Sequence, residues 1–422
     1  MAHKFELSPA ISKYLDRHLV FPLLEFLQEK GIYDEGDIMK AKLALLRNTN
    51  MVDFAMDIHK SLYEGSPVPP AMKERRAEVV ARLRQLQQDV DPIIKCLENP
   101  NVVRNFRQDK TFNMQFLQED FSIGPEHVEA LYLYAKFQFE CGNYSMAADL
   151  LQPYRTLCTN SERNMSALWG KLSSDILMQN FEAAREDINK LRDAIDNQTF
   201  APPLVQLQQR TWLLHWSLYV FWNHENGKND LLDLFMSPPY LAAIQINAQH
   251  LLRYMAAAAV VNKRKRHVLK ELIRTIQQES YEYSDPVTQF LEFLFVHYDF
   301  DGAQQQLKDC EEVIDNDFFL TACREEFVEN ARLFIFETYC RIHQTIDIKL
   351  LAERLNMGIE AAEKWITNLI LNARLNAKID AKSGTVVMGT QSESVHEQLV
   401  EKSKQLSVRT FMLANTVVGT AR

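Results

Sequence analysis

The chain has 422 residues, of which 46% are hydrophobic and 24% are charged, and its formal net charge is −9. This composition excludes a disordered chain and supplies cores for roughly two or three domains or one elongated helical repeat. The acidic balance argues against a protein whose main task is to grip nucleic acid, because that task needs a dense surplus of Lys and Arg.

The cysteines and the hydropathy of the chain predict its redox state and location. No two cysteines form a C-x-x-C pair, and all lie among apolar residues, which is typical of buried, reduced thiols. They are Cys96, Cys141, Cys158, Cys310, Cys323 and Cys340. The N-terminus lacks an apolar signal sequence, and no apolar run reaches the about 20 residues that span a membrane. We expect a soluble protein of the cytoplasm, or of cytoplasm and nucleus, without membrane contact.

The first three quarters of the chain predict helices only. Residues 1–66 form an aromatic-rich N-terminal helical segment, which ends at a proline-rich break. Residues 71–98 have apolar side chains on one stripe and charges around the remainder, which predicts a long, charged connecting helix. A helical-repeat solenoid then occupies residues 126–343.

A short motif marks the repeats. An aromatic residue stands three positions before an alanine, at the predicted turn between two helices, and the first two copies begin at residues 144 and 181. This spacing is close to that of tetratricopeptide-like repeats. The small alanine lets two helices approach closely, and the ring fills the groove beside it. The three copies are Tyr144 with Ala147, Phe181 with Ala184, and Phe300 with Ala303.

The C-terminal part predicts a winged helix at residues 345–389 and a final helix at 392–417. Two short helices come first; Asp347 fits the N-cap of one, and the other carries Trp365, which we expect to pack against the last repeat helix. The fold class is therefore all-α with a small winged-helix element.

Two strands, 377–380 and 385–388, complete the winged helix around a Lys-Ser-Gly turn. A two-stranded wing leaves unpaired backbone groups on the second strand, and such an open edge pairs readily with another protein. We therefore expect a partner-binding edge at Thr385, Val386, Val387 and Met388.

No catalytic or cofactor-binding motif is present. The sequence lacks a G-x-x-x-x-G-K-[ST] phosphate loop, a G-x-G-x-x-G fingerprint, a G-x-S-x-G elbow and an H-E-x-x-H zinc motif. Its 11 histidines include no pair spaced to hold zinc. Acidic pairs such as Glu311-Glu312 lie on charged helix faces without a catalytic partner. We expect no enzyme activity, no metal, no cofactor and no small-molecule substrate.

One basic segment stands out in this acidic chain. Four consecutive cations begin it, and two more continue the same helical face beside an apolar stripe. Three interpretations stay open: a solvated helix face, contact with ribosomal RNA or an acidic partner, and a nuclear import signal. The residues are Lys263, Arg264, Lys265, Arg266, Lys270 and Arg274.

The order of helical repeats, winged helix and C-terminal helix resembles the PCI module, which is shared by the proteasome lid, the signalosome and eukaryotic translation initiation factor 3. Longer strings narrow the resemblance to the e-subunit family of that factor, in register over residues 10–410. Among them are HLVFPLLEFL (18–27), NMVDFAMDI (50–58), YAKFQFECGNYS (134–145), LQQRTWLLHWSL (207–218), RLFIFETYCRIHQTI (332–346) and AEKWITNLILNARLNAKID (362–380).

This resemblance implies a non-catalytic scaffold subunit that docks to other PCI subunits of initiation factor 3. It also implies that the assembled factor binds the small ribosomal subunit and supports recruitment of initiator tRNA and mRNA. In such complexes the winged helices meet in an arc and the C-terminal helices form a bundle. The alternative is a scaffold subunit or regulator of a proteasome-lid or signalosome-type particle, since family members are linked to both.

Overall fold

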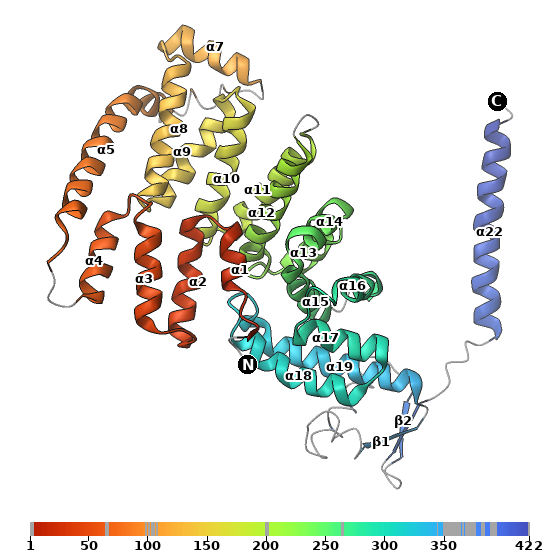
Figure 1. Ribbon diagram of the computed structural model, residues 1–422. Helices are drawn as coiled ribbons and strands as arrows, with labels where there is room; N and C mark the ends of the chain where they lie inside the picture. Colours follow the sequence, from red (N-terminus) through yellow and green to blue (C-terminus); the bar gives the residue numbers. More distant parts are fainter. Residues whose placement is uncertain are drawn as a thin grey trace. The chain divides into compact units, whose positions relative to one another are not determined.

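Figure 1 shows the computed structural model of the chain. It describes residues 4–63, 67–97, 99, 102, 106, 109–198, 202–262, 266–343, 345–348, 364, 367, 377–380, 385–388 and 395–420. The chain forms two compact units, unit 1 with residues 1–298 and 305–331 and unit 2 with residues 299–304 and 332–422. The predicted segments 1–66 and 71–98 thus share unit 1 with most of the predicted solenoid.

The N-terminal part of unit 1 is helical, as the sequence predicts. Its elements are α1 (Ser8–Ile11), η2 (Ser12–Tyr14), α2 (Arg17–Lys30), α3 (Glu35–Leu46), α4 (Val52–Leu62) and α5 (Pro70–Leu97). The long charged helix expected at 71–98 is α5. Its C-terminal half buries Leu86, Val90 and Ile93, whereas most side chains before them are exposed. Near its start, Met72 packs against the core formed by α2, α3 and α4, and Arg75 donates a hydrogen bond to the Thr49 carbonyl oxygen at 3.0 Å.

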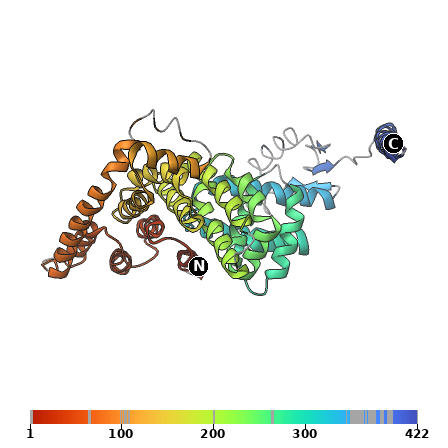
Figure 2. The same ribbon diagram turned by 90° about the horizontal axis from the view of Figure 1, so that it is seen from above.

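The following helices stack in chain order, which is what a repeat solenoid requires. α8 packs on α9, α9 on α10, α10 on α11 and α11 on α12, and Figure 2 shows these helices side by side from above. Their bounds are α7 (Lys110–Phe121), α8 (Pro125–Glu140), α9 (Tyr144–Leu157), α10 (Ser161–Leu177), α11 (Phe181–Asp196) and α12 (Pro203–Phe221).

The aromatic–alanine motif lies where the sequence places it. Tyr144, Phe181 and Phe300 are the first residues of α9, α11 and α18 (Phe300–Asp315). The alanine that follows each of them, one turn into the helix, is fully buried. A larger side chain at that position would separate the packed helices, so the motif marks close helix contact.

Between α12 and α19, and apart from α18, unit 1 has mostly short helices, together with the 14-residue α16. They are α13 (Gly227–Phe235), α14 (Pro238–Asn247), η3 (Gln249–Leu251), α15 (Leu252–Val261), α16 (Arg266–Glu279), α17 (Pro286–Glu292), η4 (Phe293–His297) and η5 (Thr321–Cys323). α15 is buried along its entire length. α19 (Arg324–Ile342) ends the run of repeats.

The N-terminal segment is fastened to the middle of the chain. The Trp216 indole Nε1 of α12 donates a hydrogen bond to the Tyr14 carbonyl oxygen at 3.0 Å, and the Tyr219 hydroxyl donates to the Leu19 carbonyl oxygen at 2.6 Å. The Tyr14 ring stacks on the imidazole of His215, with 4.4 Å between ring centroids. These contacts join residues about 200 positions apart, which no local sequence pattern predicts.

A buried charge cluster, which we call the Arg253 cluster, holds the same segment. The Arg253 guanidinium of α15 donates to the carboxylates of Asp285 and Asp317, at 2.6 and 3.2 Å, and to the Phe5 carbonyl oxygen at 2.6 Å. Arg253, Asp285 and Asp317 are all buried. Tyr254 donates a further hydrogen bond to Asp317 at 2.9 Å. The cluster therefore pairs every charge that it removes from water.

Candidate functional site

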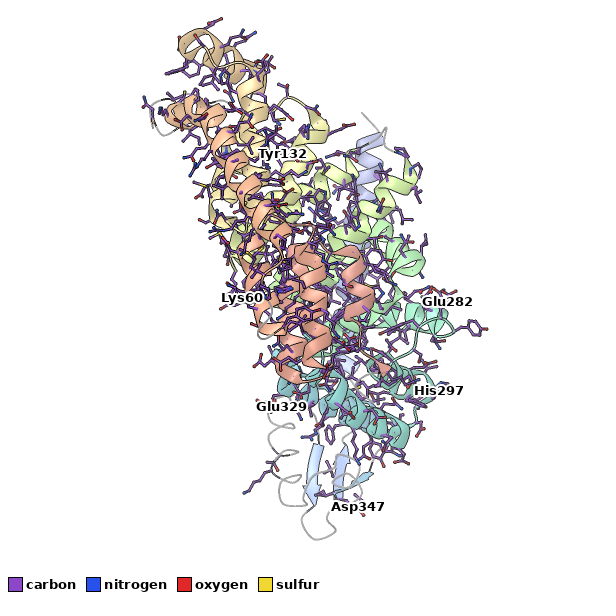
Figure 3. All side chains as sticks on the ribbon, turned by 60° about the vertical axis from the view of Figure 1, so that its left-hand side comes forward. Lys60, Tyr132, Glu282, His297, Glu329 and Asp347 are labelled. Atoms are coloured by element: carbon purple, nitrogen blue, oxygen red, sulfur yellow. The ribbon has the colours of Figure 1, made fainter. Side chains whose placement is uncertain are left out.

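The described strands of the C-terminal part form a three-stranded antiparallel sheet. They are β1 (Thr345–Asp347), β2 (Ala377–Asp380) and β3 (Thr385–Met388), in the order β1-β3-β2. Thr345 pairs with Val387 on one side of β3, and Lys378 pairs with Val387 on the other. Figure 3 labels Asp347 at the end of β1. Strands β2 and β3 have the predicted bounds.

The predicted open edge at Thr385, Val386, Val387 and Met388 is wrong. β3 is the central strand: Thr385, Val386 and Val387 have partners in both neighbouring strands, and Met388 has a partner in β2. The Val386 side chain is fully buried. The element that the sequence pattern does not predict is β1. Asp347 is the last residue of this strand and the next residue, Ile348, is helical, so the predicted N-cap role of Asp347 stays a prediction. The β-branched pair Thr345-Ile346 is the available indication of a strand. A partner contact through other atoms of the four residues stays a prediction.

Most of the predicted winged-helix helices lie outside the described residues. This includes Trp365, so its packing against the last repeat helix stays a prediction. Lys364 and Thr367 are described, and both are helical and exposed.

The basic segment is described in part. Lys263, Arg264 and Lys265 lie outside the described residues. Arg266 is the first residue of α16, but its side chain lies outside what the structure describes. Lys270 and Arg274 are exposed, while Leu269, Leu272 and Ile276 of the same helix are buried. The predicted division of this helix into a basic and an apolar face is therefore confirmed for these residues.

The C-terminal helix α22 (Val395–Thr420) presents apolar side chains to solvent. Every side chain described in α22 is exposed. Leu399, Leu406 and Leu413 are each more than half exposed and stand seven residues apart. Leucines at this spacing form one seam along a helix, which is the arrangement that packs in helix bundles and coiled coils. We call these three residues the leucine seam.

The described side chains offer little for covalent or metal chemistry. Burial raises the pKa of the Cys141 thiol to about 11 and that of Cys323 to about 12, so neither is a thiolate at neutral pH. Within the described ranges no group of three or more His, Cys, Asp or Glu side chains could hold a metal ion. None of the helices described there is long and apolar enough to cross a membrane.

Two family models match the chain. The "eIF3 subunit 6 N terminal domain" matches residues 6–138, and the "PCI domain" matches residues 307–390. The first covers α1 to α8 for all but two residues of α8, and the second includes the strands β1, β2 and β3.

The chain is also similar over its whole length to proteins named as the E subunit of eukaryotic translation initiation factor 3. The protein from Arabidopsis thaliana is 56% identical over 425 residues, which cover 98% of this chain and 96% of that one. The relative from Bombyx mori is 46% identical, covering 98% and 95%, and that from Aedes aegypti is 48% identical, covering 97% and 94%. The chain therefore belongs to the E-subunit family of eukaryotic translation initiation factor 3.

Proposed function

We propose that this chain is a non-catalytic scaffold subunit of initiation factor 3 that docks to other PCI subunits. The assembled factor would bind the small ribosomal subunit in the cytoplasm and support recruitment of initiator tRNA and mRNA. The observation that carries the proposal is the leucine seam of α22. An isolated helix gains little stability in water, so an exposed apolar seam along such a helix favours packing against helices of partner subunits.

Replacement of Leu406 with Asp should break the leucine seam at its centre. A charge in the contact must be desolvated, so we expect co-purification of other PCI subunits to fall at least about tenfold. Ser407→Asp is the matched control, because it places the same charged residue one position away in the same helix, outside the seam. Equal recovery of partners with both variants would refute docking through the seam.

The basic face of α16 is proposed as a secondary contact to ribosomal RNA. Lys270→Glu with Arg274→Glu should leave assembly of the factor intact and weaken its co-sedimentation with small ribosomal subunits. Loss of two phosphate contacts should lower the slope of log affinity against log salt by about two. The matched control is the double variant Arg82→Glu with Arg84→Glu, which reverses two exposed cations of α5. Equal salt dependence of the parent and the α16 variant would leave only a solvated face or an import signal.

The alternative function is a scaffold subunit or regulator of a proteasome-lid or signalosome-type particle, because these share the PCI module. A single affinity purification from cell extract separates the two. Co-sedimentation with small ribosomal subunits supports the initiation-factor function, whereas co-purification with peptidase activity supports the alternative.

A further inference from the structure

A large apolar groove lies in unit 1, far along the chain from the residues that match the PCI domain. It has a volume of about 1330 Å³, above the about 300–1,000 Å³ of typical small-molecule pockets. Its floor is the outward face of α9, which carries Met146, Asp149, Leu150 and Pro153. Ile94 and Leu97 of α5 form one wall, and Met178, at the end of α10, lies at the margin. The size suits a peptide segment rather than a cofactor.

Helix α9, on which the groove is built, carries apolar side chains on its outer face as well as on its buried face. α9 buries Ala147, Leu151 and Tyr154 against its repeat neighbours, as a solenoid helix must. Its opposite face, which water should cover, also carries apolar side chains, and Met146 is 45% exposed. Met178 at the margin is exposed to the same extent. Methionine is unbranched and polarisable and adapts to the shape of a partner, so it is frequent on surfaces that bind other helices.

The walls of the groove determine what backbone an occupant can have. Apart from the carbonyls that Pro92 and Pro153 leave without an intrahelical donor, the backbone groups inside α5, α9 and α10 are paired within each helix. The sides of these helices therefore offer no continuous row of donors and acceptors to an extended peptide. A helix brings its own paired backbone and needs only side-chain contacts. A helical occupant would place apolar residues at steps of three and four into the groove.

The charge of the groove determines the polar part of the occupant. Of the described residues that line it, Asp149 alone is charged, and within the described chain its carboxylate makes neither a hydrogen bond nor an ion pair. A carboxylate beside apolar surface favours a Lys or Arg on the partner, because the pair is partly shielded from water once the groove is filled.

We propose that this groove binds an amphipathic helix of another protein of the assembled factor. The helix would insert apolar side chains between Met146 and Leu97 and pair a Lys or Arg with Asp149. This contact is separate from docking through α22 and the PCI-matched residues. It would give the N-terminal half of the chain a partner of its own.

Site-specific photo-cross-linking in the assembled factor tests the groove. A benzoylphenylalanine at Met146, in the full-length chain purified with its complex, should cross-link to a helical segment of another polypeptide. Mass spectrometry should identify in that segment apolar residues at steps of three and four and a Lys or Arg. The matched control is the same probe at Leu133, which is 38% exposed on the neighbouring helix α8 and does not line the groove.

Charge reversal tests the role of Asp149 in the same experiment. Asp149→Lys should lower the cross-link yield from position 146 at least about tenfold, because like charges then meet in the contact. Asp89→Lys, at an exposed carboxylate of α5 outside the groove lining, should leave the yield unchanged. Thermal melts of both variants, compared with the parent, establish that the fold is retained.

Four results would each overturn the proposal. They are a yield at Met146 no greater than at Leu133, a cross-link within the same chain, a cross-link to a second copy, and equal yields from the Asp149 and Asp89 variants.

Discussion

Replacement of Arg253 with Met will lower the free energy of unfolding by about 3–5 kcal/mol, measured as a shift of the urea-unfolding midpoint. The substitution removes the cation but leaves the carboxylates of Asp285 and Asp317 in a site that excludes water. Burial already raises the pKa of Asp317, although the neighbouring guanidinium opposes that shift. Without Arg253, at least one carboxylate must remain charged and unpaired, or take up a proton at a cost in free energy.

Two further variants separate the charge effect from lost packing. Arg82→Met removes an exposed guanidinium of α5, and we expect a change within about 0.5 kcal/mol. Asp317→Asn in the Arg253→Met background should restore part of the loss, because a neutral amide is cheaper to bury and its oxygen can still accept the Phe319 N–H. If Arg253→Met unfolds at the same urea concentration as the parent, the Arg253 cluster contributes no net stability.

Unit 1 will lose stability steeply as the pH falls below about 6.5, the ordinary pKa of histidine. His215 donates through Nδ1 to the Thr211 carbonyl oxygen at 2.7 Å, so its Nε2 accepts from His250 Nε2 at 2.9 Å. Both imidazoles are neutral in this arrangement. Burial, together with the neighbouring His250, lowers the pKa of His215 to about 3; burial, Arg253 and Lys13 lower that of His250 to about 4.

The sign of the effect follows from which state binds more protons. Between pH 6.5 and 4 the unfolded chain protonates both histidines and the folded chain protonates neither. Stability is therefore complete above about pH 6.5 and is lost as the pH falls toward the folded pKa values. Two protons correspond to a slope of at most about 2.7 kcal/mol per pH unit.

Unfolding by urea at several pH values between 7 and 5 measures this slope above the range in which most carboxylates titrate. In the His250→Gln variant, the slope of the unfolding free energy against pH should fall by the contribution of about one proton, whatever the stability of the variant at pH 7. His18 is a third buried histidine with a lowered pKa, and it stays unchanged in this comparison. Equal slopes of unfolding free energy against pH for the parent and His250→Gln would show that His215 and His250 are accessible to water and do not form a buried, neutral pair.

The sequence predicts what depends on neighbours along the chain. The aromatic–alanine motif places the starts of α9, α11 and α18 because an aromatic ring and a small residue one turn apart are both local features. The bounds of β2 and β3 follow from alternation and a glycine turn. β1 escapes prediction because three residues carry little alternation and Asp347 fits a helix cap equally well.

Local sequence patterns do not predict contacts between residues that are far apart in the chain. An arginine in the apolar run LLRYMAAAAVV indicates a buried, paired cation, yet its carboxylate partners stand 32 and 64 residues away. His215 and His250 are 35 positions apart and share no motif. The groove over α9 depends on which neighbouring helices leave its outer face uncovered. That is a property of packing, and the amphipathic pattern of α9 does not contain it.

The hydrogen bond from Arg253 to the Phe5 carbonyl oxygen also sets an order of events during synthesis. Its two residues are 248 positions apart. At about 5–20 residues per second, a ribosome needs roughly 12–50 s to make the intervening chain. During that interval the segment around Phe5 has already left the ribosome, but the part of unit 1 that contains Arg253 has not yet been synthesised. The apolar residues of the N-terminal segment, among them Ile11 and Leu19, are then free to bind chaperones or to find wrong partners.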